Sequence, residues 1–243
     1  MTEFSDLCYL PLDLPLAPKI NGIELIRRAN FKKSENNNID AWHTYPLRWT
    51  GKHRDHFRMM YHFESPWRWV DLSAATSAEL RPLMDYVERE IPYRRLTYAV
   101  LLQNIEAGVL PHLDFIPLPP EIMRMQPANY RILVEGELFP SLFVCENLAG
   151  DGLRYAELPT TTNTFVLNAQ AFHGAVHRNP KCILFLAGEV DEARHYDLLR
   201  RSREKYQAQE ITFASLSQGV KSFREENRHA PKFDESKASR IYY

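Results

Sequence analysis

The chain has 243 residues, of which 44% are hydrophobic and 25% charged, enough for one large domain or two small ones. Its formal net charge of −1 gives no field that would gather the protein on nucleic acid or on an acidic membrane, so both partners are disfavoured. The three cysteines, none in a C-x-x-C pair, exclude a disulfide framework and argue against a structural zinc site.

The first residues, MTEFSDLCYLPLDLPL, do not have the pattern of a secretory signal peptide. Acidic residues stand where a signal peptide needs positive charge, and prolines interrupt the apolar run. No apolar stretch approaches the roughly 18 residues that a membrane-spanning helix needs. We therefore expect a cytoplasmic protein that makes no membrane contact.

The region before residue 96 is expected to hold short strands, one of them over residues 22–31, and a single amphipathic helix over residues 78–91. The apolar residues of this helix recur at helical spacing: Leu80, Leu83, Met84, Val87 and Ile91. Because Pro82 is poorly tolerated in a helix interior, the helix is expected to begin near Glu79 or Leu80.

From residue 96 to residue 191 the pattern is almost wholly β, with seven short runs rich in β-branched and aromatic residues. Because no long helix separates these runs, they predict an antiparallel sandwich or jelly roll, that is, a mainly β fold with flanking α-helices. We expect one domain over 1–243, in which 1–95 packs on a core over 96–191. A helical segment and a polar tail over 192–243 complete it.

The stretch PHLDF places His112 and Asp114 two residues apart, so on an extended strand both side chains share a face. His173 lies in a later β-rich stretch that could reach the same place. Two histidines and one carboxylate leave three coordination positions of Fe(II) open, which suits an iron that binds a co-substrate together with O2. A second H-x-D pair, His53 and Asp55, lies in a polar, turn-like segment, whereas His112 follows an apolar strand, which favours His112.

The segments LLQNIEAGVLPHLDF, NYRILVEGEL and TFVLNAQAFHGAVHRNPKCILFLAGEVD resemble the core of the iron(II)/2-oxoglutarate-dependent oxygenases. The nearest branch is that of the aspartyl/asparaginyl β-hydroxylases and prolyl-hydroxylase-like enzymes, and the resemblance covers roughly residues 96 to 191. It implies a double-stranded β-helix (jelly-roll, cupin-like) core with His112, Asp114 and His173 as Fe(II) ligands. It also implies 2-oxoglutarate and O2 as co-substrates, and hydroxylation of an amino-acid side chain, free or in a peptide or protein, with release of succinate and CO2.

The same resemblance implies a basic residue that pairs with the distal carboxylate of 2-oxoglutarate. Lys181 opens the last core strand and ranks first, although it follows His173 by eight residues instead of the family's ten or so. Arg131 is similar in position to an arginine that some of these hydroxylases use for a carboxylate of co-substrate or substrate, and Arg178 is a third candidate. His177 is the fallback for His173 as the metal ligand.

Each of these residues also has an ordinary structural interpretation. His173 suits a core histidine, Asp114 a turn, Lys181 a solvated hairpin and Arg131 a cross-strand ion pair. Two other functions stay open: a non-redox cupin-like metalloprotein with the same ligands, and a jelly-roll ligand-binding module without iron. The expected partner is a small molecule or a peptide, and the oligomeric state is left open.

Overall fold

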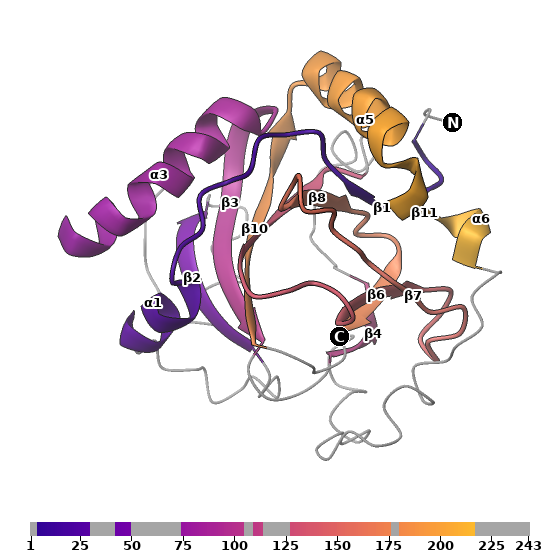
Figure 1. Ribbon diagram of the computed structural model, residues 1–243, viewed down its shortest axis with the longest axis horizontal. Helices are drawn as coiled ribbons and strands as arrows, with labels where there is room; N and C mark the ends of the chain where they lie inside the picture. The colour runs from indigo at the N-terminus through magenta and orange to yellow at the C-terminus, as the bar shows by residue number, and fades with distance from the viewer. Residues whose placement is uncertain are drawn as a thin grey trace.

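The protein is described from a computed structural model, in which two antiparallel sheets and several helices are seen (Figure 1). The prediction of a mainly β fold with flanking α-helices is confirmed. No helix in the described part of the chain is long and apolar enough to cross a membrane. The structure describes residues 4–29, 42–49, 74–104, 109–113, 127–175 and 180–216.

The larger sheet has seven strands in the order β11-β1-β8-β5-β10-β3-β2. The strands of this sheet, in chain order, are β1 Leu7–Pro11, β2 Trp42–Trp49, β3 Tyr93–Asn104, β5 Asn129–Glu135, β8 Thr164–Leu167, β10 Lys181–Val190 and β11 Ile211–Thr212. Each of the six neighbouring pairs is antiparallel.

The smaller sheet has four strands in the order β4-β9-β6-β7. Its bounds are β4 Val109–His112, β6 Leu142–Cys145, β7 Arg154–Tyr155 and β9 Phe172–Ala175. Across the two sheets the pairing is nested: β3 pairs with β10, β4 with β9, β5 with β8 and β6 with β7.

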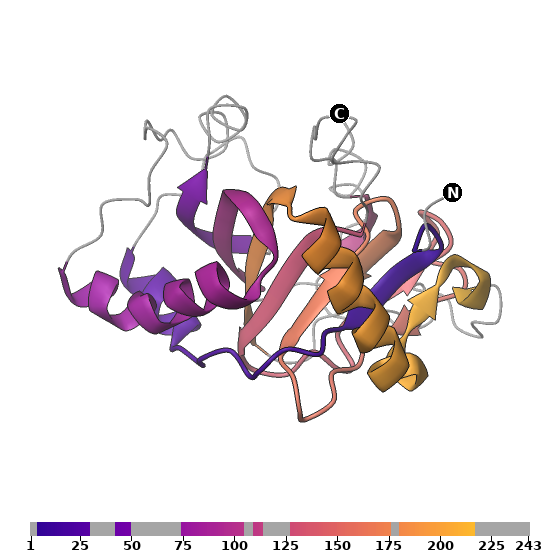
Figure 2. The ribbon, with the colours of Figure 1, turned by 90° about the horizontal axis from the view of Figure 1, so that it is seen from above.

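Strand β10 shows how the larger sheet divides its two faces. Cys182, Leu184 and Leu186 pack in a cluster with residues of the helices α1 Gly22–Ala29, α3 Ala74–Glu90 and α5 Glu192–Tyr206. These helices cover one face of the sheet (Figure 2). Because side chains alternate along a strand, Lys181, Ile183 and Phe185 face the smaller sheet instead. A short 3-10 helix and a last helix complete the described chain, η1 Gln207–Gln209 and α6 Phe213–Leu216.

The strand predicted over residues 22–31 is wrong, because the chain forms helix α1 there. Gly22, Leu25 and Ile26 are buried at the i, i+3 and i+4 positions of one helical face. A Cβ added at Gly22 would lie 2.6 Å from the Sγ of Cys182, so the glycine lets the helix rest directly on β10. Tertiary packing against the sheet therefore overrides the strand preference of the isoleucines.

Helix α3 begins earlier than predicted, at Ala74 instead of near Glu79, and Pro82 lies inside it. Pro82 lacks the N–H that would bond to the carbonyl of Ala78. Both Pro82 and Ala78 are exposed, so solvent reaches the helix face where that hydrogen bond is missing. The buried face, which includes Leu80 before the proline and Leu83 and Val87 after it, holds the helix on the sheet across this position.

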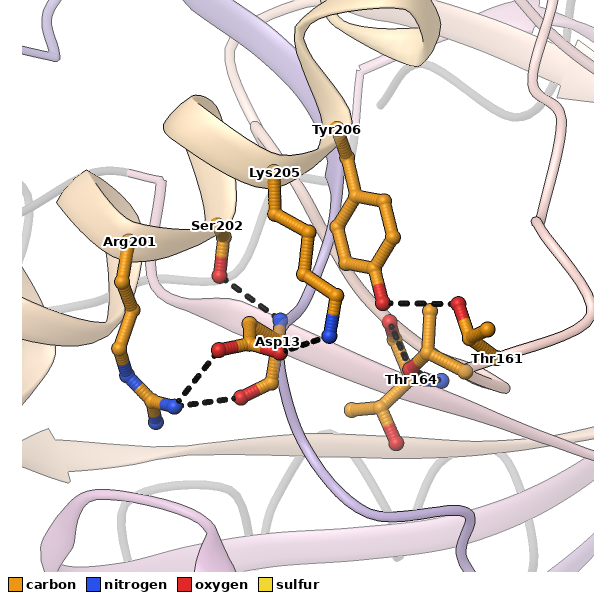
Figure 3. Close-up of polar contacts among 8 residues, drawn as sticks. Asp13, Thr161, Thr164, Arg201, Ser202, Lys205 and Tyr206 are labelled. Atoms are coloured by element: carbon orange, nitrogen blue, oxygen red, sulfur yellow. Dashed lines mark hydrogen bonds and ion pairs between the residues drawn. The ribbon is translucent and has the colours of Figure 1, made fainter.

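Helix α5 packs on its own chain through its buried residues and a polar contact at its C-terminal half. The Asp191 side chain caps the helix by accepting from the Arg194 backbone N–H. Further along, Lys205 Nζ lies 2.5 Å and Arg201 Nη1 3.1 Å from the Asp13 carboxylate, while Ser202 Oγ accepts from the Asp13 N–H at 2.9 Å (Figure 3). These contacts tie the segment after β1 to the helix.

We expect Asp13→Asn to lower the free energy of unfolding at pH 7 by about 0.5–1 kcal/mol, because two partly exposed ion pairs lose their charge. The hydrogen bond from Lys205 is the main reason why the pKa of Asp13 lies below its usual range. The stabilisation is thus fully present above the ordinary carboxyl pKa of about 4 and is lost as pH falls through the lowered value. Urea unfolding at pH 7 and pH 3 measures both effects. Glu88→Gln, on an exposed position of α3, is the control, and an Asp13→Asn protein as stable as this control at pH 7 contradicts the prediction.

Candidate functional site

A pocket opens between the two sheets and holds four of the predicted site residues. It encloses about 380 Å³ of empty space, counting the open solvent at its mouth. The residues that line it come from both sheets: Leu102, His112, Arg131, Leu142, His173, Gly174, Ala175, Lys181, Ile183 and Phe185. The fold thus brings together side chains that lie up to 83 residues apart in the sequence, from Leu102 to Phe185.

His112 and His173 face each other across the pairing of β4 with β9. Their ring centres are 4.5 Å apart. His173 Nδ1 lies 2.9 Å from the carbonyl oxygen of Ala171, and its Nε2 lies 3.5 Å from Nη2 of Arg131. Because arginine has no acceptor, a hydrogen bond between these two residues requires Nε2 to accept, which assigns the ring proton to Nδ1, beside the Ala171 carbonyl. The two contacts hold the His173 ring in a fixed orientation, with Nε2 directed toward Arg131.

The separation of the two imidazole rings is compatible with two ligands of one metal ion. Two rings bound to one metal at about 2.1 Å and at a right angle have centres about 4.6 Å apart, close to the separation found here. The hydrogen bond to Ala171 is the kind of outer contact that orients a metal-binding histidine. Within the described ranges no three His, Cys, Asp or Glu side chains gather around one point, and Asp114, the predicted third ligand, lies outside those ranges.

Arg131 is among the largest fully buried side chains of the protein, with 2% of its surface exposed. Its position on β5 is opposite Phe185 on β10, and its guanidinium carbon lies 4.0 Å from the centre of the Phe185 ring. This stacking holds the planar guanidinium against one wall of the pocket. Arg131 is therefore a fixed cation beside Nε2 of His173.

Lys181 is the second buried cation of the pocket, with 3% of its surface exposed. Its ammonium donates a hydrogen bond to the hydroxyl of Ser141, which precedes β6. Burial lowers the pKa of Lys181 from its ordinary value to about 8, because the charged form loses hydration. Near neutral pH the amine is thus mostly protonated, although burial destabilises its charged form. A bound anion would offset this destabilisation.

Among the described residues that line the pocket, the charge is positive on balance. Lys181 and Arg131 both line it, and no carboxylate is among the described residues that do. The rest of the wall is largely apolar, including Leu102, Ile183 and Phe185. A low-polarity wall strengthens the attraction between buried cations and an anion, so the pocket suits an anionic ligand.

The structure brings some of the predicted site residues together and does not describe others. His112, His173, Lys181 and Arg131 lie together as expected, although their roles stay predictions. Lys181 is not a solvated hairpin residue, since it is almost fully buried. Asp114, His177 and Arg178 lie outside the described residues.

Two polar residues of this region escaped the sequence analysis. Ser141 belongs to no motif, and only its hydrogen bond to Lys181 reveals it. Asn129, at the start of β5, is buried on the face that carries Arg131. Its position two residues before Arg131 was the one clue in the sequence that both side chains share a face of the strand.

No family model and no curated protein matches the chain. Among solved structures, an oxidoreductase of the 2OG-Fe(II) oxygenase family from Burkholderia pseudomallei matches with a TM-score of 0.33 and 12% sequence identity. The match covers 70% of this chain and 79% of that one. A TM-score this low gives no argument about function, so the function is inferred from the residues of the pocket.

Proposed function

We propose that the protein is an Fe(II)- and 2-oxoglutarate-dependent dioxygenase that hydroxylates an amino-acid side chain, free or in a peptide. The observation that carries this proposal is one pocket that joins two facing imidazoles to two buried cations, with no carboxylate among its described lining residues. Imidazoles suit Fe(II), and buried cations suit a dicarboxylate.

The nested strand pairing supports the same proposal. Eight consecutive strands, β3 to β10, pair first with last toward the centre and are divided between two sheets. A long hairpin wound in this way is a jelly roll, the architecture that cupins also use. We therefore propose a double-stranded β-helix core, with the pocket between its two sheets, in a single domain with the flanking segments.

The chain's own residues have distinct tasks in this proposal. His112 and His173, with Asp114, hold the metal, and the Ala171 carbonyl keeps the His173 ring in place. Lys181 and Ser141 bind the distal carboxylate of 2-oxoglutarate, and Arg131 binds a carboxylate of co-substrate or substrate.

The apolar wall, which includes Leu102, Ile183 and Phe185, keeps water away from the reacting atoms. Fe(II), when bound, would supply the oxidising chemistry, in which 2-oxoglutarate, O2 and the substrate are converted into succinate, CO2 and hydroxylated substrate, with one oxygen atom of O2 in succinate and the other in the new hydroxyl group. Positioning of the C–H bond beside the metal is then the main contribution of the protein.

An anaerobic absorbance titration tests the proposal. Fe(II) is added to the purified apoprotein at one equivalent, followed by 2-oxoglutarate, and a weak visible charge-transfer band is expected to grow to saturation. If Fe(II) binds but no band appears at any 2-oxoglutarate concentration, the oxygenase proposal is wrong and a non-redox cupin-like protein takes its place. If Fe(II) does not bind, the protein is a ligand-binding module.

The affinity for 2-oxoglutarate is expected to fall as pH rises above about 8. Lys181 has a pKa of about 8 in the ligand-free pocket, so above this pH the amine is neutral before binding. A carboxylate partner raises that pKa, so binding takes up a proton and the dissociation constant rises by up to about tenfold per pH unit. Anaerobic titrations of the Fe(II) protein at pH 7, 8, 8.5 and 9 measure this. A dissociation constant that is flat across this range contradicts the role of Lys181.

A further inference from the structure

Tyr130 differs from the other tyrosines of the core in the group that is hydrogen-bonded to its hydroxyl. The hydroxyl lies 2.6 Å from Nδ1 of His195, and both side chains are 0% exposed. The hydroxyls of Tyr9, Tyr86 and Tyr93 donate instead to backbone carbonyl oxygens. An imidazole nitrogen is a base near neutral pH and a carbonyl oxygen is not, so Tyr130 is the one of these four with a proton acceptor.

The proton between Tyr130 and His195 belongs to the tyrosine. Burial raises the pKa of Tyr130 well above its ordinary value, so the phenol is neutral. Nδ1 of His195 is the one hydrogen-bond partner that the described residues give its hydroxyl. The hydroxyl donates to Nδ1, because its buried proton would otherwise have no acceptor. The distance of 2.6 Å is within the range over which a proton transfers along a hydrogen bond.

This pair of side chains lies directly behind the pocket. Tyr130 precedes Arg131 on β5, and its partner on β10 is Leu186, which follows Phe185. Arg131 and Phe185 line the pocket, whereas Tyr130 packs in the cluster between the sheet and the helices. Tyr130 and Arg131 project to opposite faces of β5 from Cα atoms that are about 3.8 Å apart. One layer of backbone therefore separates the phenol from the pocket.

A second tyrosine connects the pair with the surface. The ring centre of His195 is 5.9 Å from that of Tyr130 and 5.3 Å from that of Tyr196. Tyr196, on helix α5, is only partly buried. A chain of three aromatic rings thus runs from the strand behind the pocket to a phenol that solvent reaches.

We propose that Tyr130 donates one electron to a strongly oxidising iron centre in the pocket, that His195 takes the proton, and that Tyr196 connects the pair with reductants in solution. In this step the O–H bond of Tyr130 breaks. The electron reduces the iron centre by one unit and the proton forms an N–H bond at Nδ1, which leaves a neutral phenoxyl radical and an imidazolium.

The return of an electron and a proton restores Tyr130. The electron comes from Tyr196 and the proton comes back from Nδ1, while Tyr196 loses its own proton to water. A thiol or ascorbate in solution then returns one electron and one proton to Tyr196. The inference rests on the proposed function, which supplies the oxidant. It adds a protective activity: when no substrate C–H bond is in place, the oxidising equivalent leaves through Tyr130 instead of attacking the pocket.

The redox activity of the pair is tested first without iron. The apoprotein is oxidised by a flash in the presence of a ruthenium tris-bipyridine complex and an irreversible electron acceptor, and electron paramagnetic resonance records tyrosyl radicals. The wild type is expected to give a component that is lost in Tyr130→Phe and in His195→Asn. Asparagine places an amide near the position of Nδ1, so it keeps a hydrogen-bonding partner that is not a base. Tyr86→Phe is the matched control and is expected to keep the component, because it removes a buried hydroxyl that donates to a carbonyl.

The link to the pocket is tested in the Fe(II) protein with 2-oxoglutarate, after the visible band has been recorded. O2 is added without a substrate, and samples are frozen at successive times. The same radical component is expected, absent from Tyr130→Phe and His195→Asn and present in Tyr86→Phe. Tyr196→Phe is expected to form it and to keep it severalfold longer in the presence of ascorbate, because the connection to solvent is removed.

Four results would overturn the inference: a photochemical signal that is the same in Tyr130→Phe as in the wild type, a signal that a folded His195→Asn protein keeps in full, a Tyr196→Phe radical that decays as fast as that of the wild type, or a protein that has the visible band and gives no tyrosyl signal with O2. Tyr130→Phe keeps the ring and its packing, so the test does not depend on the stability of His195→Asn. A missing band is a failure of the proposed function, which removes the oxidant and overturns the inference as well. It is distinguished from the other results because the photochemical signal of the apoprotein is then intact.

Discussion

His173→Ala is expected to lower the affinity for Fe(II) at least about 100-fold, and His112→Ala to have an effect of the same size. Each substitution removes one of the two imidazoles that face each other at 4.5 Å. Loss of an outer contact to a metal ligand already costs 10–100-fold in affinity, so loss of a ligand costs more. Anaerobic competition with a chromophoric chelator measures the affinity, and circular dichroism verifies that the variants are folded.

Two other histidines provide matched controls for this experiment. His53→Ala changes the second H-x-D pair of the sequence and is expected to bind Fe(II) like the wild type. His177→Ala tests the fallback ligand and is expected to do the same. A His173→Ala protein with normal affinity, together with a defective His177→Ala protein, would transfer the role of distal ligand to His177.

Lys181→Met is expected to weaken the binding of 2-oxoglutarate by about 10–100-fold while Fe(II) affinity is unchanged. A buried, charge-assisted hydrogen bond is worth about 1.5–3 kcal/mol, which corresponds to this range. Methionine keeps most of the volume of the side chain, so no large cavity forms. Because burial lowers the pKa of Lys181, its charged form is disfavoured in the fold, and the thermal midpoint of the ligand-free variant at pH 7 is expected not to fall.

The control for this charge removal is Lys19→Met, since Lys19 is exposed and lies outside the pocket. Absorbance titration of the three Fe(II) proteins with 2-oxoglutarate gives the dissociation constants. An unchanged constant in Lys181→Met would assign the distal carboxylate to another cation. Arg131→Met would then be the variant with the weakened binding.

The strands of the core were predictable because their periodicity is local. The run of residues from Lys181 to Val190 alternates between pocket and helix faces, and its composition alone marks it as a strand. Helix α1 was not predictable in this way, since its identity depends on how closely Gly22 approaches Cys182 on a strand 160 residues later. Helix α3 likewise continues through Pro82 because the sheet beneath it supports both halves.

The pocket was predictable only in part, for a related reason. His112 and His173 have a recognisable order and strand context, so the resemblance predicted them as ligands, and both line the pocket. Ser141 has no such pattern. Its importance comes from a contact made in three dimensions, the hydrogen bond to Lys181.

The nested pairing of β3 to β10 also constrains how the chain reaches its native state. The innermost pair, β6 with β7, closes a short loop. The pairing of β3 with β10 closes a long one, because β10 follows β3 by more than 75 residues. Contacts of such high sequence separation slow folding, because the entropy of the long loop is lost before the pairing is gained. His112 and His173 belong to β4 and β9, the second-outermost pair. On a ribosome, the two imidazoles cannot meet until nearly the whole core has been synthesised.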